Sequence, residues 1–321
     1  MSVEVVRGDL VESVHHVAAC AASARGDVIL WTGDIESPVF LRSAAKPFIA
    51  GAAIEAGARE AFDLDMREIA VMSASHTGEP FHVDAVRSIL RKIGLDESAL
   101  QCGSQEGRPD GAIYNNCSGK HAGILALCRT IGAQIATYME TENAAQARIL
   151  AFCARISDDD PATWPLGVDG CGIPVYATSL RNAAMAFARF ASLTQLEPRD
   201  AMALLVVRDA MVSHPEYVCG TGEFDTRLMA VAGGAIACKA GAEGVHGVAL
   251  IPEGIGFASK VLDGASRARA PLTMAGLKAL GSPVAAATEL GGFAAPIVYN
   301  RAGRAVGSIR VRPSFAVEQA S

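Results

Sequence analysis

The sequence VEVVRGDLVESVHHVAACAASARGDVILWT, residues 3–32, decides the fold class of this chain. It contains three segments that are predicted as β-strands, Val3–Val6, Ser13–Ala21 and Val28–Thr32. The pairs Gly8-Asp9 and Gly26-Asp27 separate these segments and are turn signals. The chain is therefore expected to begin with three strands joined by turns.

A mainly helical stretch follows these strands. The segment Ser43–Ala56 is predicted as a helix, because it is rich in Ala and has Ser at its start. The short apolar run Glu68–Ala74 is predicted as a buried strand. Further helices are predicted at Phe81–Ile93, Lys120–Ile131, Glu142–Arg155, Leu180–Ser192 and Pro198–Val212.

Strand-like segments return near the end of the chain, around one predicted helix at Leu272–Leu280. They are Ile236–Ala240, Val245–Ile251, Gly256–Leu262, Ile297–Tyr299 and Ala305–Arg312. Strands at both ends with helices between them predict an α+β fold, in which both chain ends form one antiparallel sheet flanked by helices. Residues 1–57 and 213–321 are expected to form this sheet domain, and residues 58–212 a mainly helical region.

Composition excludes several classes of protein. Half of the 321 residues are apolar and only 19% are charged, so a packed core is expected. The net charge of −6 gives no basis for nucleic-acid binding. The N-terminus lacks the basic start and apolar run of a signal peptide, and no apolar run is long enough to span a membrane. We therefore expect a cytoplasmic protein that binds neither nucleic acid nor membrane.

The eight cysteines are expected to be thiols in a reducing compartment. The sequence has no C-x-x-C pair, which disfavours thioredoxin-like redox chemistry and a zinc ribbon.

The first motif with chemical meaning is Arg42-Ser43-Ala44-Ala45-Lys46-Pro47. Ser43 and Lys46 are three residues apart at a helix start, so they share a face, and a lysine amine can activate a serine if its pKa is lowered. Pro47 fits only in the first helical turn and so places Ser43 at the helix N-terminus. The motif alone occurs often by chance, and an N-cap serine with a solvated lysine is its structural alternative.

A second motif, Ser73-Ala74-Ser75-His76-Thr77-Gly78-Glu79-Pro80, follows the apolar run. Its hydroxyl and imidazole groups could point into a pocket. They could equally form a turn that caps the helix beginning near Pro80.

Two cysteine motifs, NNCSGKH at 115–121 and VDGCGIP at 168–174, could form two arms of one site. Zinc accepts thiolate and nitrogen donors, which Cys117, Cys171, Lys120 and His121 could supply. Coordination by Lys120 would need its neutral amine. A polar helix start is the structural alternative for the first motif.

The last motif is Cys238-Lys239-Ala240-Gly241, at the end of a predicted strand. A Lys-x-Gly strand beside an S-x-x-K helix is the arrangement of penicillin-binding enzymes, although Ala takes the middle position here. Lys239 could otherwise be an edge-strand lysine that blocks sheet extension.

Together these stretches resemble the rhizobial-type, or class 3, L-asparaginases. The matching segments occur in the family's order over most of the chain: RGDLVES (7–13), SPVFLRSAAKPF (37–48), SASHTGE (73–79), NNCSGKHAG (115–123), GVDGCGIP (167–174) and KAGAEGV (239–245). The resemblance implies a fold similar to the serine β-lactamases and glutaminases, and a homodimer.

The resemblance also implies a set of site residues. The catalytic residues would form two pairs, Ser43 with Lys46 and Ser75 with Lys239. A zinc ion would be held by Cys117, Lys120 and Cys171. Residues expected to bind substrate are Arg42, His76, Asn116, His121 and Asp169.

These observations predict hydrolysis of L-asparagine to L-aspartate and ammonia, with Ser43 as nucleophile, Lys46 as base and zinc orienting the substrate. A glutaminase, a β-lactamase or a peptidoglycan peptidase on the same fold is an alternative. A zinc- or amino-acid-binding protein without turnover is another.

Overall fold

The computed structural model describes residues 1–312 and 315–317. Within them, both ends of the chain build one large antiparallel sheet. Its strands are β1 (Ser2–Arg7), β2 (Leu10–Ser23), β3 (Val28–Thr32), β7 (Ile236–Ala240), β8 (Val245–Leu250), β9 (Ile255–Val261), β10 (Ile297–Tyr299), β11 (Ala305–Arg312) and β12 (Ala316–Val317). They lie in the order β10-β11-β1-β2-β9-β8-β7, with β3 beside β2 and β12 beside β3.

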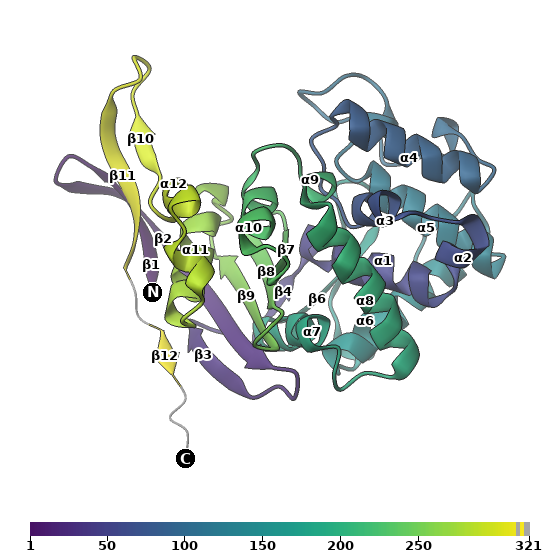
Figure 1. Cartoon of the computed structure of the whole chain (residues 1–321), viewed down its shortest axis with the longest axis horizontal. Helices are drawn as coiled ribbons and strands as arrows, with labels where there is room; N and C mark the ends of the chain where they lie inside the picture. The colour runs from purple at the N-terminus through teal and green to yellow at the C-terminus, as the bar shows by residue number, and fades with distance from the viewer. Residues whose placement is uncertain (313–314, 318–321) are drawn as a thin grey trace.

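The two chain ends interleave in this sheet. Strand β1 pairs with β11 on one side and with β2 on the other, and β2 in turn pairs with β9. Figure 1 shows these N-terminal strands, in purple, between the yellow and green strands of the C-terminal part. The predicted α+β class, with an antiparallel sheet from both chain ends and a mainly helical middle, is confirmed.

The middle of the chain is mostly helical. The α-helices are α1 (Lys46–Glu55), α2 (Ala58–Phe62), α3 (Met66–Met72), α4 (Pro80–Lys92), α5 (Ser118–Ile131), α6 (Ala144–Ser157), α7 (Leu180–Ser192), α8 (Pro198–Ser213), α9 (Pro215–Val218), α10 (Phe224–Ala232), α11 (Arg269–Ala279) and α12 (Gly291–Ala294). A 3-10 turn, η1 (Arg42–Ala45), precedes α1, and other 3-10 turns lie at Glu97–Ala99, Ala112–Tyr114, Pro161–Thr163, Ser266–Ala268, Pro283–Ala286 and Thr288–Leu290. A small second sheet has the order β4 (Pro38–Phe40), β6 (Pro174–Ser179), β5 (Leu166–Val168).

Helices cover both faces of the large sheet. Gly256 of β9 lies directly against the backbone of α7, and its neighbour Phe257 lies against Gly276 of α11. Because successive residues of a strand point to opposite faces, α7 and α11 lie on opposite faces of the sheet. The assignment of residues 1–57 and 213–321 to one domain and 58–212 to another stays a prediction.

One predicted element is wrong: Glu68–Ala74 is not a strand, because most of it belongs to helix α3. Asp65 caps this helix, since its side chain accepts hydrogen bonds from the backbone N–H of Arg67 and Glu68. Glu68 Oε2 accepts one in return from the Asp65 N–H at 2.7 Å, which completes a capping box. The cap fixes a helical start that the apolar run alone does not reveal.

All eight cysteines are free thiols. Among the described residues, no helix has both the length and the apolar character needed to cross a membrane.

Candidate active site

The turn that carries Ser43 has an unusual backbone. Arg42, just before it, has φ +52°, a left-handed conformation that costs free energy for any residue with a Cβ. The Arg42 guanidinium is fixed by Asp169, with Nη2 2.7 Å and Nε 2.9 Å from Oδ1. Strain of this kind persists where the surroundings enforce it, and it is common at functional sites. Ser43, the next residue, is half-buried within the 3-10 turn η1.

Lys46 begins α1, and its side chain is completely buried. Its ammonium nitrogen Nζ donates to Ala74 O at 2.5 Å, Ser75 Oγ at 3.0 Å and Asn116 O at 3.5 Å. Burial lowers the pKa of Lys46 to about 8, with further lowering by nearby lysines and an opposing effect of Cys117. Lys46 therefore exists partly as the neutral amine that can accept a proton from a hydroxyl group.

Ser75 lies in the loop between α3 and α4, where neighbouring groups fix its backbone. The Ser75 N–H donates to Val218 O at 2.9 Å, and the His76 N–H donates to Asn116 O at 3.2 Å. Both His76 ring nitrogens are engaged: Nδ1 accepts from the Gly78 N–H at 3.1 Å, and Nε2 lies 2.9 Å from Ser118 Oγ. In this arrangement the fully buried His76 holds the loop and has no free ring nitrogen.

Lys239 is completely buried at the end of β7, and burial lowers its pKa. Its Nζ donates to Ala240 O at 2.7 Å. Within the described residues, Ser43 and Lys46 are joined by a backbone hydrogen bond, in which the Lys46 N–H donates to Ser43 O. No side-chain hydrogen bond joins Ser43 to Lys46 or Ser75 to Lys239, and the side-chain link between a serine and a lysine of the site is Lys46–Ser75.

The cysteine motifs also meet. Lys120 Nζ lies 2.9 Å from Cys171 Sγ and 3.8 Å from Asp169 Oδ2. The two thiols form a hydrogen-bonded pair, which lowers the pKa of Cys117 well below its usual value and raises that of Cys171. Burial would lower the pKa of Lys120, but the two sulfurs and Asp169 outweigh it and raise that pKa. This is a buried spot that attracts positive charge.

Two other predicted site residues lie beside this cluster. Asn116 Oδ1 lies 3.0 Å from Cys117 Sγ, and its backbone oxygen accepts from Lys46. His121 Nδ1 lies 2.6 Å from Tyr138 Oη, and its buried Nε2 has no partner among the described residues. Burial lowers the pKa of His121, so its ring is neutral.

A mostly apolar cavity of about 60 Å³ adjoins the Arg42–Asp169 ion pair and Lys120. Its walls, as far as the described residues form them, include neither Ser43 nor Ser75. The cavity therefore borders the site but does not contain the two hydroxyl groups.

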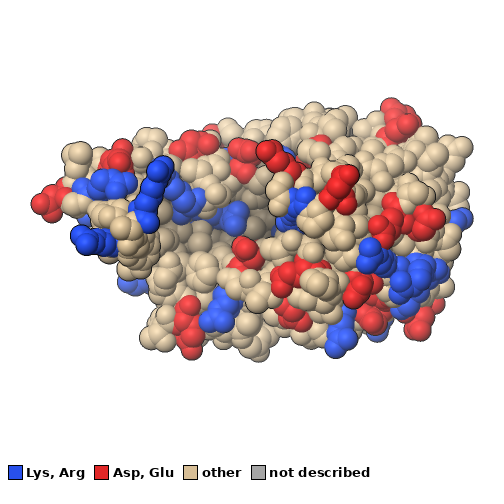
Figure 2. All heavy atoms as spheres, turned by 90° about the horizontal axis from the view of Figure 1, so that it is seen from above, with Lys and Arg blue, Asp and Glu red and all other residues tan. Residues whose placement is uncertain are grey.

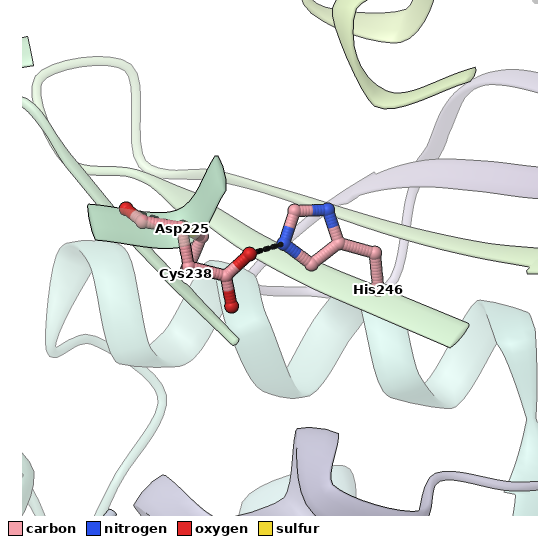
Figure 3. Close-up of side chains that lie close together, drawn as sticks. All are labelled: Asp225, Cys238 and His246. Atoms are coloured by element: carbon pink, nitrogen blue, oxygen red, sulfur yellow. Dashed lines mark hydrogen bonds and ion pairs between the residues drawn. The ribbon is translucent and has the colours of Figure 1, made fainter. Parts of the chain in front are cut away.

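A second cluster of possible metal donors was not predicted from the sequence. Asp225 of α10, Cys238 of β7 and His246 of β8 are all buried, and their donor atoms lie within 4.8 Å of one another, close enough to hold a metal ion (Figure 3). Cys238 and His246 come from paired strands, since Ala240 lies opposite His246 and Cys238 is two residues earlier on the same face. An Asp in a helix and a His in a distant strand have no spacing that would have revealed them.

Comparison with known structures agrees with the fold. Two structures of Mglu match this chain at 15% sequence identity. The first has a TM-score of 0.50 and covers 89% of this chain and 72% of the Mglu chain. The second, the native form in 4.3 M NaCl, has a TM-score of 0.51 and covers 89% of this chain and 66% of the Mglu chain. These matches show a shared fold. A β-lactamase from Mycobacterium bovis matches at 15% identity and TM-score 0.41, covering 78% of this chain and 88% of the β-lactamase.

No curated protein matches the chain significantly. The sequence model of the L-asparaginase II family matches residues 3–311, and this range includes every motif described above. The chain therefore belongs to the L-asparaginase II family, which implies an asparaginase hydrolase activity.

Proposed function

We propose that this protein hydrolyses L-asparagine to L-aspartate and ammonia through an acyl intermediate on Ser43. The observation that carries the proposal is the hydrogen bond of 3.0 Å between Lys46 Nζ and Ser75 Oγ, one turn from Ser43, in a chain of the L-asparaginase II family. This hydrogen bond supports a role for Lys46 as a base that also contacts the hydroxyl group of Ser75, as a proton relay requires.

In the proposed reaction, Ser43 Oγ attacks the side-chain amide carbon of asparagine and passes its proton to the neutral Lys46 amine. The resulting ammonium passes a proton to Ser75 Oγ, while Ser75 gives its own proton to the departing NH₂ group, which leaves as ammonia. Water then attacks the acyl carbon and gives a proton to Lys46. The bond between the acyl carbon and Ser43 Oγ breaks, Lys46 returns the proton to Ser43 Oγ, and L-aspartate leaves. Lys239, whose charged form burial disfavours, would act on Ser75 from the end of β7.

Substrate positioning falls to the charged groups beside Ser43. We propose that Arg42 and Asp169 bind the α-carboxylate and α-amino groups of asparagine, with Asn116 and His121 nearby. His76 would act through the loop it holds, because both its ring nitrogens are already engaged.

We also propose that Cys117, Lys120 and Cys171 hold a zinc ion. Two sulfurs and one nitrogen are a donor set that suits zinc, and the spot already favours positive charge. A zinc ion bound there would supply a Lewis acid that orients a polar group of the substrate. Binding would require Lys120 to lose a proton, which the charge of the ion favours.

The homodimer and the cytoplasmic location expected from the sequence stay predictions. On the face shown in Figure 2, acidic and basic side chains are interspersed over much of the surface.

The test is to locate the acylated serine. Mass spectrometry of the protein trapped with a slow asparagine analogue should find the adduct on Ser43, and an adduct on Ser75 would overturn this assignment. Ser43→Ala should lower kcat for ammonia release by about 10³-fold or more, whereas the exposed Ser98→Ala should leave it unchanged. Rates for glutamine and for a chromogenic β-lactam, measured in parallel, test the alternative hydrolases. Bound asparagine that stays intact for hours would show a binding protein without turnover.

A further inference from the structure

The peptide group of Ala240 is held from both sides. Strand β7 is an edge strand of the sheet, so one row of its backbone groups has no partner among the described strands. The Ala240 N–H donates instead to Asp225 Oδ2 at 2.7 Å, and the Ala240 carbonyl accepts from Lys239 Nζ at 2.7 Å. A side chain of α10 therefore holds the peptide that in turn holds Lys239.

The Asp225 carboxylate is itself held in place. Its second oxygen, Oδ1, lies 3.2 Å from His246 Nε2, and His246 Nδ1 lies 2.7 Å from Thr273 Oγ1. Figure 3 shows the carboxylate and the imidazole directed at each other. All three side chains are buried, and neither Oδ1 nor Nε2 has a hydrogen-bond partner elsewhere in the described residues. The 3.2 Å contact with His246 is thus the one ion-pair contact that the described residues give to Oδ1, while Oδ2 accepts from the Ala240 N–H.

The same strand end touches the turn that carries Ser43. A Cβ on Gly241 would lie 2.5 Å from Leu41 O and 3.3 Å from Ala44 N, and Ser43 lies between these two residues. A shift of the Ala240 peptide would therefore move both Lys239 and the Ser43 turn.

We propose that Asp225, braced by His246 and Thr273, is a positioning residue that sets Lys239 and the Ser43 turn at their working distance. The proposal rests on the proposed roles of Ser43 and Lys239. Asp225 touches neither the substrate nor the reacting atoms; it acts through the Ala240 peptide.

Bound metal would give the cluster of Asp225, Cys238 and His246 a different role. The charges around it favour positioning. Burial raises the pKa of Asp225, but His246, and after it Lys239 and Arg269, lower this pKa and outweigh burial. Burial also raises the pKa of the Cys238 thiol, so the sulfur is protonated. A cation added there would have two cationic neighbours.

The test compares two Asp225 variants with a matched buried carboxylate. Asp225→Asn keeps an oxygen for the Ala240 N–H and loses the charge, whereas Asp225→Ala loses both. Asp200→Asn is the control, because Asp200 is equally buried and pairs with Arg155, outside the proposed site. We expect Asp225→Ala to lower kcat for asparagine by about 100-fold and Asp225→Asn by about tenfold, each with KM within about threefold.

The control should lose thermal stability with kcat within about twofold of wild type. Asp225 variants that lose stability but no more kcat than Asp200→Asn would overturn the proposal. Thr273→Val removes only the hydroxyl group behind His246 and covers the case in which the Asp225 variants do not fold. An unchanged kcat in Thr273→Val would count against positioning. A lower kcat without a change in KM would support it. Metal analysis gives one more test. If Cys238→Ala and His246→Gln each lose one metal equivalent that Cys171→Ala keeps, the positioning role of Asp225 is also overturned. If Ser43→Ala keeps full activity, the proposed function fails; if Ser43→Ala is inactive and the Asp225 variants are not, only positioning fails.

Discussion

The Lys46 ammonium nitrogen lies 3.0 Å from Ser75 Oγ, while Ser43 receives no side-chain hydrogen bond in the described part of the chain. The sequence motif pairs Ser43 with Lys46 because they are three residues apart on one helix. The structure adds a contact across 29 residues that no local spacing predicts, and this contact joins the Lys46 amine to Ser75.

Replacing Lys46 by Met should separate catalysis from stability. The variant loses the base, so kcat for asparagine should fall by about 10³-fold with KM nearly unchanged. Because burial of the ammonium lowers its pKa to about 8, an apolar chain of similar length removes an unfavourable buried charge. The melting temperature should therefore stay equal or rise.

Lys92→Met is the matched control for Lys46→Met. Lys92 also donates to a backbone carbonyl and lies 2.7 Å from a glutamate, but outside the site. It should leave kcat unchanged. A Lys46→Met protein that keeps more than a tenth of the wild-type kcat would remove Lys46 from the role of base.

The left-handed backbone at Arg42 gives a second prediction. Arg42→Gly and Arg42→Ala both lose the ion pair with Asp169, but only glycine adopts φ +52° without strain. Urea denaturation should find Arg42→Gly more stable than Arg42→Ala by about 1 kcal/mol. Both should raise KM for asparagine by similar factors, because the guanidinium is the proposed substrate contact. Equal stabilities would mean that the turn relaxes and that no strain is stored there.

Metal analysis should find about one zinc per chain in the purified protein. Cys117→Ser and Cys171→Ser should lose it, because both sulfurs are proposed ligands. Cys238→Ser is the control, since it lies in the other donor cluster and should keep the zinc. Loss of zinc in Cys238→Ser alone would move the metal to the cluster of Asp225 and His246.

The sequence predicts the helices and strands well where they are long or where clear turn signals separate them. Helix α7 and strands β10 and β11 have the predicted bounds, and the sheet from both ends follows from the strand–helix–strand order. Strand β5 was not predicted, because its segment Leu166-Gly167-Val168 contains a glycine, whereas the equally short β10 consists of three strand-forming residues. The strand predicted at Glu68–Ala74 is wrong because the Asp65–Glu68 capping box, visible as D-x-x-E, outweighs an apolar run of ambiguous type.

Motif residues are brought together by the fold, but their partners were not predictable. Lys120 and Cys171 meet at 2.9 Å although they are 51 residues apart. The two cysteine motifs allowed this meeting, and the resemblance implied it. The brace of Asp225, His246 and Thr273 joins a helix, a strand and another helix, so no local pattern contains it.

Acid should destabilise the protein through His82. This buried ring lies 2.8 Å from Glu216 O through Nε2, and burial lowers its pKa below 6.5. As pH falls through 6.5, the unfolded chain binds a proton that the folded protein does not, so the free energy of unfolding decreases by at most about 1.4 kcal/mol per pH unit for this residue. Burial also lowers the pKa of His76, which stacks on His82, so His76 changes the free energy of unfolding with pH in the same direction. Urea denaturation between about pH 7 and 5 should show that the free energy of unfolding decreases less in His82→Gln than in the wild type. The exposed His16→Gln should match wild type, and a His82→Gln slope equal to wild type would exclude His82 as the acid-sensitive group.

The contact between Gly241 and the Ser43 turn gives the last prediction. A methyl group on Gly241 would overlap Leu41 O, which lies in rigid backbone and cannot move like a side-chain end. Gly241→Ala should therefore displace either β7 or the Ser43 turn and lower kcat by about 100-fold, with a loss of about 1–3 kcal/mol in the free energy of unfolding. Gly292→Ala is the control, because no atom of the described residues lies within 4 Å of a Cβ there, and it should leave both quantities unchanged. If Gly241→Ala loses stability but keeps its kcat, the strand end packs against the turn without setting the geometry of the nucleophile, and Ser43 would have to be positioned by the Arg42–Asp169 ion pair alone.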